Sequence, residues 1–258
     1  MIVKFLNGES ILRTLCIYNN KGGVGKTSIT GALSVEFVIK GKKVLMVDTD
    51  AQGNLSTQFM NKVPIENELA DYLNDYNIGL ENCIYKTRYD NLYIVPSKEM
   101  VNGGKIKDWI PANSHQDIIK YLVEDAEKLG FDYLIFDTAP AFSDANKKYM
   151  FASDEIIPVL QVAKTSLDGI VNYYVTLKQF KGRDDKAVSN KIIFNQYEKS
   201  KAVQKALLPE IMKLPAKKYL IPTDQAFRKA ELGGIAVQEI GIKQETQDVL
   251  NQIISDIE

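Results

Sequence analysis

Cysteine is scarce in this sequence, and long apolar stretches are lacking. The 258 residues include two cysteines, Cys16 and Cys83, too few for a disulfide framework or a cysteine-rich metal site. No segment approaches the roughly 20 apolar residues that a membrane-spanning helix needs. The apolar start of the chain is broken by Lys4 and Asn7, so it lacks the core of a secretion signal. We therefore expect a cytoplasmic protein.

A charge excess of either sign is also lacking. The chain has 32 lysines and arginines against 33 aspartates and glutamates, for a formal net charge of −1. The field of the whole molecule therefore does not attract nucleic acid, and any such binding requires a local basic patch. Hydrophobic residues make up 45% and charged residues 25%, which is typical of a globular protein with a sizeable core.

The sequence does contain a regular alternation of short apolar runs and amphipathic segments. Runs typical of strands buried on both faces lie at 15–18, 43–47, 92–95, 133–136, 155–159, 191–194 and 217–220. Apolar residues at helical spacing lie at 27–40, 115–129, 166–180 and 243–257. This alternation predicts an α/β fold, a mostly parallel twisted β-sheet with helices on both faces. We expect a single domain over 1–258, in which the less regular region 54–110 is a candidate insertion.

The first motif is the glycine-rich segment "NNKGGVGKTS" at 19–28, which lies between a predicted strand and a predicted helix. This is the context of a phosphate-binding P-loop, although Asn20 stands where the strict pattern has glycine. Backbone N–H groups and the positive end of the helix dipole would bind phosphate oxygens. The residues expected to contact a nucleotide are Gly22, Gly23, Val24, Gly25, Lys26, Thr27 and Ser28. Lys26 is expected on the β- and γ-phosphates and the Thr27 hydroxyl on Mg²⁺, unless the segment is a glycine-rich turn without a ligand.

A second lysine, Lys21, is surplus to this chemistry because Lys26 already supplies the phosphate-binding charge. The two lysines resemble the deviant Walker A loop of the ParA/MinD family of ATPases, K-G-G-x-G-K-T-[ST]. The resemblance implies a P-loop NTPase architecture, ATP and Mg²⁺ as cofactors, and a homodimer that forms around the nucleotides. It also implies that Lys21 reaches the phosphates held by the partner subunit. The alternative is that Lys21 is a solvated loop charge.

The segment "DTDAQGN" at 48–54 follows a predicted strand and is similar to the family's D-x-D-P-Q-G-N. Ala51 departs from the usual proline. The match implies that Asp50 positions or polarises the attacking water, and that Asp48 helps to organise the metal and the loop. Carboxylates at the carboxyl end of a strand lie where doubly wound sheets bind ligands. The alternative is a plain turn, since these residue types are common in turns.

The segment "FDYLIFDTAP" at 131–140 looks like a Walker B element, an apolar strand that ends in Asp137. The resemblance implies that Asp137 holds Mg²⁺ through a water molecule. Ala139 and Ala141 depart from the more usual proline and serine of the following loop.

Two positions near the ends of later predicted strands resemble the base-binding side of the family. Asn195 stands where the family often has an asparagine near the adenine, and Pro222, within 221–237, would border the base. Each is equally compatible with a plain turn at a strand end.

The resemblance as a whole implies a ParA-type partition ATPase of the short kind, because the few residues before the first predicted strand leave no room for a helix-turn-helix domain. Its ATP dimer would bind DNA without sequence preference, and a centromere-binding ParB-type partner would stimulate slow hydrolysis. The residues expected to contact DNA phosphates are Arg228, Lys229, Lys199, Lys201, Lys205, Lys217 and Lys218. The alternative is that these charges are solvated helix faces.

Other functions stay open. A MinD-like positioning ATPase would attach to membranes by a basic amphipathic tail, whereas 242–258 has acidic residues on its polar face, so no membrane partner is expected. A small-molecule P-loop ligase of the dethiobiotin synthetase type would need neither DNA nor a protein partner. An ATP-binding scaffold with little hydrolysis is a third alternative.

Overall fold

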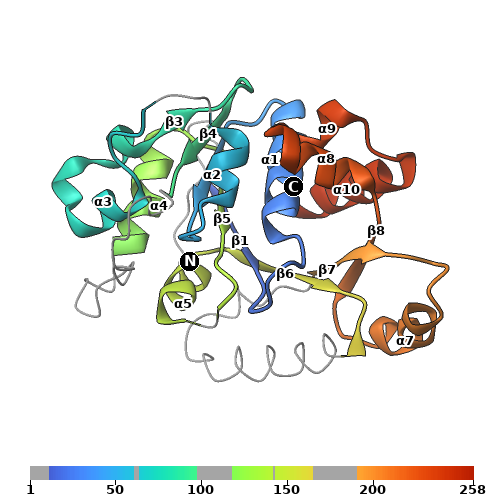
Figure 1. Cartoon of the computed structure of the whole chain (residues 1–258). Helices are drawn as coiled ribbons and strands as arrows, with labels where there is room; N and C mark the ends of the chain where they lie inside the picture. The colour runs from blue at the N-terminus through green and yellow to red at the C-terminus, as the bar shows by residue number, and fades with distance from the viewer. Residues whose placement is uncertain (1–11, 61–63, 98–117, 142, 165–190) are drawn as a thin grey trace.

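The computed structural model describes residues 12–60, 64–97, 118–141, 143–164 and 191–258. In this part of the chain, eight strands form one sheet in the order β3-β4-β2-β5-β1-β6-β7-β8, and helices cover both faces (Figure 1). The strands are β1 (Arg13–Tyr18), β2 (Val44–Asp48), β3 (Tyr85–Lys86), β4 (Leu92–Val95), β5 (Tyr133–Asp137), β6 (Glu155–Gln161), β7 (Lys191–Tyr197) and β8 (Lys217–Pro222). The helices are α1 (Lys26–Ile39), α2 (Asn54–Phe59), α3 (Leu69–Asn74), α4 (Ile118–Lys128), α5 (Asp144–Phe151), α7 (Ala202–Met212), α8 (Gln225–Gly233), α9 (Val237–Ile240) and α10 (Gln244–Ile257).

The sheet is parallel except for the pair of β3 and β4 at one edge. Every residue of β2 and β5 is buried. Such strands have apolar side chains on both faces, which is why they form continuous apolar runs in the sequence. β1 lies between β5 and β6, near the centre of the sheet, so the loop after β1 opens at the middle of the carboxyl edge.

Two apolar layers enclose the sheet. On β1, Leu15 and Ile17 pack in the layer shared with α1 and α10, while Cys16 and Tyr18 pack in the layer shared with α3, α4 and α5. A smaller cluster continues the second layer under α7. Figure 1 shows α1, α8 and α10 on one side of the sheet and α5 and α7 on the other. Neighbouring residues of β1 thus pack in opposite layers, which buries the strand on both faces directly before the glycine-rich loop.

The predicted fold class is confirmed, and each of the seven predicted strands corresponds to a strand of the structure. The helix predicted at 27–40 is α1 and that at 243–257 is α10, while α4 covers the described part of 115–129. The helix predicted at 166–180 lies outside the described residues. Within 54–110 the structure has α2, α3 and β4, together with β3, a two-residue strand too short to leave a pattern in the sequence. No helix in the described ranges is long and apolar enough to cross a membrane.

Candidate nucleotide site

The glycine-rich loop connects the carboxyl end of β1 to the first residue of α1, as a phosphate loop requires. Gly23 (φ 72°) and Gly25 (φ 94°) adopt left-handed backbone conformations that favour glycine. A Cβ atom at Gly25 would also lie 2.2 Å from Nδ2 of Asn195. The loop therefore needs glycine at position 25 for both its backbone conformation and the closeness of β7.

The two lysines of the loop occupy different environments. Lys26 begins α1 and is 7% exposed, with its Nζ donating to the carbonyl oxygen of Lys21 at 3.4 Å. Burial lowers the pKa of Lys26, and the nearby carboxylates of Asp137 and Asp50 oppose this shift. The residue Lys21 is instead exposed. One lysine therefore lies inside the loop and the other on its outer rim.

Asp137 ends β5 and is almost fully buried beside α1. The Thr27 hydroxyl donates to its Oδ2 at 2.7 Å, and the Thr30 hydroxyl donates to its Oδ1 at 3.2 Å. Burial raises the pKa of Asp137 to about 6. The sequence-predicted pair of Thr27 and Asp137 is thus in contact. Thr30 was missed, although its position three residues after Thr27 places both on one helix face.

Asp48 ends β2 and is the register partner of Asp137 on β5. Its Oδ2 accepts hydrogen bonds from the Ser56 backbone N–H at 2.8 Å and hydroxyl at 2.7 Å, and its Oδ1 accepts the Asp50 N–H at 3.2 Å. Burial, followed by the charge of Asp137, raises the pKa of Asp48 to about 7. Asp48 therefore anchors both ends of the segment that carries Asp50. Ser56 was missed because its spacing from Asp48 matches no local pattern.

Asp50 is half-buried at the rim of this site. Its Oδ1 accepts the N–H of Gln52 at 3.0 Å, and its carbonyl accepts the N–H of Gly53 at 2.9 Å. The residue before it, Thr49, donates its N–H to the Asp137 carbonyl at 3.0 Å. The structure therefore has a turn at these residues, and the Asp50 carboxylate in it lies close enough to Lys26 and Asp137 to act on the pKa of each.

Among the described residues, no group of three or more histidine, cysteine, aspartate or glutamate side chains is arranged so that it could hold a metal ion by itself. Mg²⁺ prefers octahedral oxygen ligands and is usually held by one or two protein groups together with phosphate and water oxygens. The hydroxyl of Thr27 and the carboxylate of Asp137, placed next to the phosphate loop, fit that requirement. These two residues could hold the ion, with Asp48 in the adjacent position.

The two residues predicted for the base side also lie at the carboxyl edge of the sheet. Asn195 is 4% exposed near the end of β7, and its Nδ2 donates to the Val24 carbonyl in the loop at 3.0 Å. Pro222 ends β8 and is half-buried. The structure brings Asn195 against the phosphate loop, a contact that the sequence did not suggest.

The basic candidates are distributed over both edges of the sheet. Lys217 and Lys218 begin β8 at the amino edge, whereas the others follow the carboxyl ends of β7 and β8. Three lysines form ion pairs: Lys199 with Glu245, Lys201 with Glu198, and Lys217 with Asp256. The Nζ of Lys218 donates to the Met212 carbonyl at 3.0 Å.

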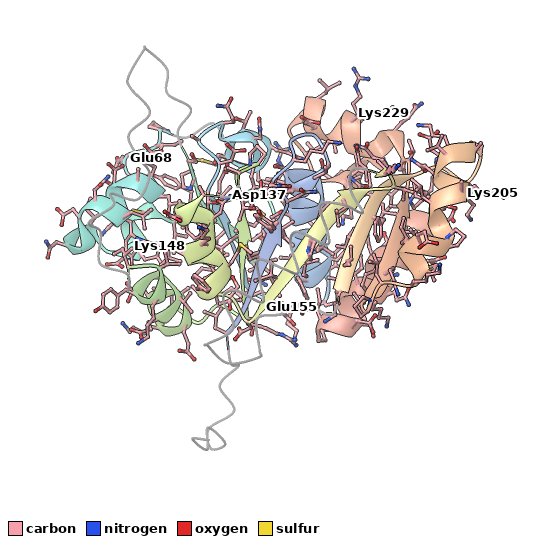
Figure 2. All side chains as sticks on the ribbon, turned by 90° about the horizontal axis from the view of Figure 1, so that it is seen from below. Glu68, Asp137, Lys148, Glu155, Lys205 and Lys229 are labelled. Atoms are coloured by element: carbon pink, nitrogen blue, oxygen red, sulfur yellow. The ribbon has the colours of Figure 1, made fainter. Side chains whose placement is uncertain are left out.

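Lys205, Arg228 and Lys229 are exposed, and none forms an ion pair with another described residue. Figure 2 shows Lys205 and Lys229 on the part of the molecule formed by the C-terminal elements, far from Glu68. Their charges are therefore the most available for an anionic partner among the candidates.

The fold and this site define a P-loop nucleotide-binding protein, and comparison with known proteins agrees. Residues 12–191 match the sequence family described as an AAA domain. The sporulation initiation inhibitor protein Soj of Bacillus subtilis is 30% identical over 167 residues, which span 64% of this chain and 65% of that protein, just under two thirds of its length.

Two solved structures share the fold over nearly their whole length. Apo McdA from Cyanothece superposes with a TM-score of 0.80 at 17% identity, covering 96% of this chain and 99% of that chain. MinD from Pyrococcus horikoshii, complexed with Mg-ADP, has a TM-score of 0.74 at 24% identity and covers 96% of each. The chain belongs to this AAA-domain family, and within it to the ParA/MinD family of ATPases.

Proposed function

We propose that this protein is an ATP-dependent dimerising partition ATPase, whose ATP-bound sandwich dimer binds DNA without sequence preference. Hydrolysis, stimulated by a centromere-binding ParB-type partner, resets the dimer, so that a plasmid or chromosome region is segregated on the nucleoid. The contrast between the two loop lysines carries the proposal. Lys26 is buried next to Asp137, whereas Lys21 is exposed at the start of the loop. An exposed lysine at that position is suited to phosphates held by a second subunit.

Each residue of the site then has a role in phosphoryl transfer, which needs mainly positioning and charge neutralisation. Lys26 binds the β- and γ-phosphates in its own subunit, and Lys21 binds those of the partner. Asp50, at the half-buried rim, orients the attacking water. Thr27 and Asp137 hold the Mg²⁺ site, and the ion, when bound, neutralises phosphate charge.

The remaining residues position these groups. Asp48 fixes the segment of Asp50 through its hydrogen bonds to Ser56 and to the Asp50 N–H. The N–H groups from Gly22 to Ser28 surround the phosphates at the start of α1. Asn195 and Pro222, at the ends of β7 and β8, border the adenine.

Light scattering with and without ATP tests the dimer. Lys26→Ala should lose tight Mg-ATP binding and stay monomeric, because a charge-assisted phosphate contact is removed. Lys21→Ala should bind ATP as a monomer and hydrolyse it poorly, whereas Asp50→Ala should bind ATP and remain a dimer. If Lys21→Ala and Asp50→Ala both dimerise and turn over like the wild type, the sandwich assignment is wrong.

A further inference from the structure

Carbonyl oxygens of the phosphate loop are held by side-chain amides from the two neighbouring strands. A loop whose N–H groups converge on phosphate turns carbonyl oxygens outward, and buried carbonyls require donors. Asn195 donates Nδ2 to the Val24 carbonyl at 3.0 Å, and Gln161 donates Nε2 to the Gly23 carbonyl at 3.2 Å. Asn195 and Gln161 are themselves register partners on β7 and β6. Two consecutive loop carbonyls are therefore tied to one place at the sheet edge.

The surroundings fix both amides. Asn195 is 4% exposed, and its Nδ2 lies 2.2 Å from the position that a Cβ atom of residue 25 would take, so the side chain fills the space next to Gly25. Gln161 also donates Nε2 to Oε1 of Gln196 at 2.6 Å. Gln196 adopts a left-handed conformation (φ 57°) within an irregularity of β7. That local kink presents its side chain to Gln161.

These amides hold the loop without placing a charge beside the phosphates. A third, Asn19, acts similarly at the start of the loop, where its Nδ2 donates to the Val159 carbonyl at 2.6 Å and its Oδ1 accepts the Lys21 N–H at 2.9 Å. Neutral donors satisfy the carbonyls, and the lysines and N–H groups are left to bind the anion. A loop held in this way loses less conformational freedom when the ligand binds.

We propose that Asn195, assisted by Gln161, is a positioning residue for the phosphate loop, and so acts on the binding of the triphosphate chain as well as bordering the base. This inference rests on the proposed nucleotide site. It differs from a base contact in one measurable respect: Asn195 should matter for a ligand that has phosphates and no base.

The experiment compares Mg-ATP with inorganic triphosphate plus Mg²⁺, each titrated against the wild type, Asn195→Ala and Gln161→Ala. Asn195→Ala should weaken both ligands about tenfold, the value of one hydrogen bond to a buried carbonyl. Gln161→Ala, at a more accessible and longer contact, should weaken both about threefold. Thermal unfolding of each variant shows whether it is folded. If Asn195→Ala is not folded, the affinities of Gln161→Ala test the proposal instead.

Three outcomes would overturn the inference. If Asn195→Ala loses affinity for ATP but keeps its affinity for triphosphate within twofold, the Asn195 side chain acts on the base alone. Folded variants that bind both ligands like the wild type would give the two amides no role. If the wild-type protein does not bind triphosphate, its phosphate loop is not prearranged for the phosphates. Lys26→Ala tests the site itself: if it leaves both affinities unchanged, the nucleotide site, and not only the positioning role, is wrongly assigned.

Discussion

At the scale of single residues, the site contains two buried carboxyl groups. Asp48 and Asp137 end adjacent strands, and their pKa values are raised to about 7 and about 6, mainly by burial. Hydroxyl donors from Thr27, Thr30 and Ser56 partly offset the cost of the charged forms. A bound cation would favour those charged forms further, so ligand binding and protonation should be coupled.

The first prediction concerns this coupling. From about pH 4, where the unfolded chain releases its carboxyl protons, up to their raised pKa values of about 7 and about 6, Asp48 and Asp137 hold protons in the folded protein. Its stability should therefore fall as the pH rises through this range. Because Mg-ATP favours the carboxylates, the increase in melting temperature on adding Mg-ATP should be larger at pH 8 than at pH 5. An increase that is constant with pH would contradict this assignment.

The second prediction concerns Thr30, whose hydroxyl donates to Asp137. Thr30→Val keeps the volume and removes the donor, which should destabilise the protein by about 1–2 kcal/mol at pH 8. At pH 5, below the raised pKa of Asp137, the loss should be smaller, because the neutral carboxyl needs the donor less. Urea unfolding measures both values. Thr30→Ser, which keeps the hydroxyl, is the control and should show a loss that does not change with pH.

At the scale of elements, α2 connects the Asp50 segment to the rest of the molecule. Phe59, the last residue of α2, packs on α1, where a Cβ atom at Gly31 would lie 2.5 Å from two ring carbons. At its other side, Gln58 donates Nε2 to the Ile235 carbonyl, between α8 and α9, at 2.9 Å. The position of the Asp50 segment is thus set by packing of Phe59 against α1 and by the hydrogen bond of Gln58 to the connection between α8 and α9, because α2 itself is only 6 residues long.

The third prediction tests the packing of α2. Alanine at a helix interior is worth roughly 1 kcal/mol over glycine. Gly31→Ala should nevertheless destabilise the protein, by about 1–3 kcal/mol, because the methyl group overlaps the Phe59 ring. Denaturant unfolding is the measurement, and Phe59→Leu in the same chain should recover part of the loss. A stabilised Gly31→Ala would show that α2 moves away freely.

At the scale of the whole molecule, the basic residues lie at two opposite ends of the strands. Arg228 and Lys229 lie on α8, beyond the carboxyl end of β8 and at the same edge as the nucleotide site. Lys217 and Lys218 begin β8 at the opposite edge and already have partners in the chain. A dimer formed at the carboxyl edge would bring two copies of α8 near one surface, which would double the charge available to DNA.

The fourth prediction follows from that placement. Replacing Arg228 and Lys229 with alanine should lower DNA affinity equally for unrelated sequences and flatten the dependence of log affinity on log salt, because fewer counterions are released. ATP-driven dimerisation should be unchanged. The matched control, Lys217 and Lys218 to alanine, should have little effect. If the control loses as much affinity, or the wild-type ATP dimer does not bind DNA, the DNA surface is wrongly placed.

Much of this protein is determined by local sequence. The strands are recognisable because burial on both faces requires continuous apolar runs, as in "KVLMV" before Asp48 and "YLIF" before Asp137. The phosphate loop is recognisable because Gly25 and Lys26 must follow one another directly for the backbone to turn into α1. Such patterns depend on residues that are only a few positions apart, so they can be read directly from the sequence.

Only the tertiary structure decided which side chains contact each other when they are far apart in the sequence. Asn195 holds Val24 because β6 and β7 continue the sheet beside β1, a strand order that no local pattern specifies. Ser56 contacts Asp48 only because the turn between them brings the chain back to the end of β2. The basic residues on either side of β8 lie far apart because the strand crosses the sheet from its amino end to its carboxyl end. Hydrogen bonds and electrostatic interactions depend on distances of a few ångströms in space, whereas the sequence gives only separation along the chain. These contacts could therefore be identified only from the tertiary structure.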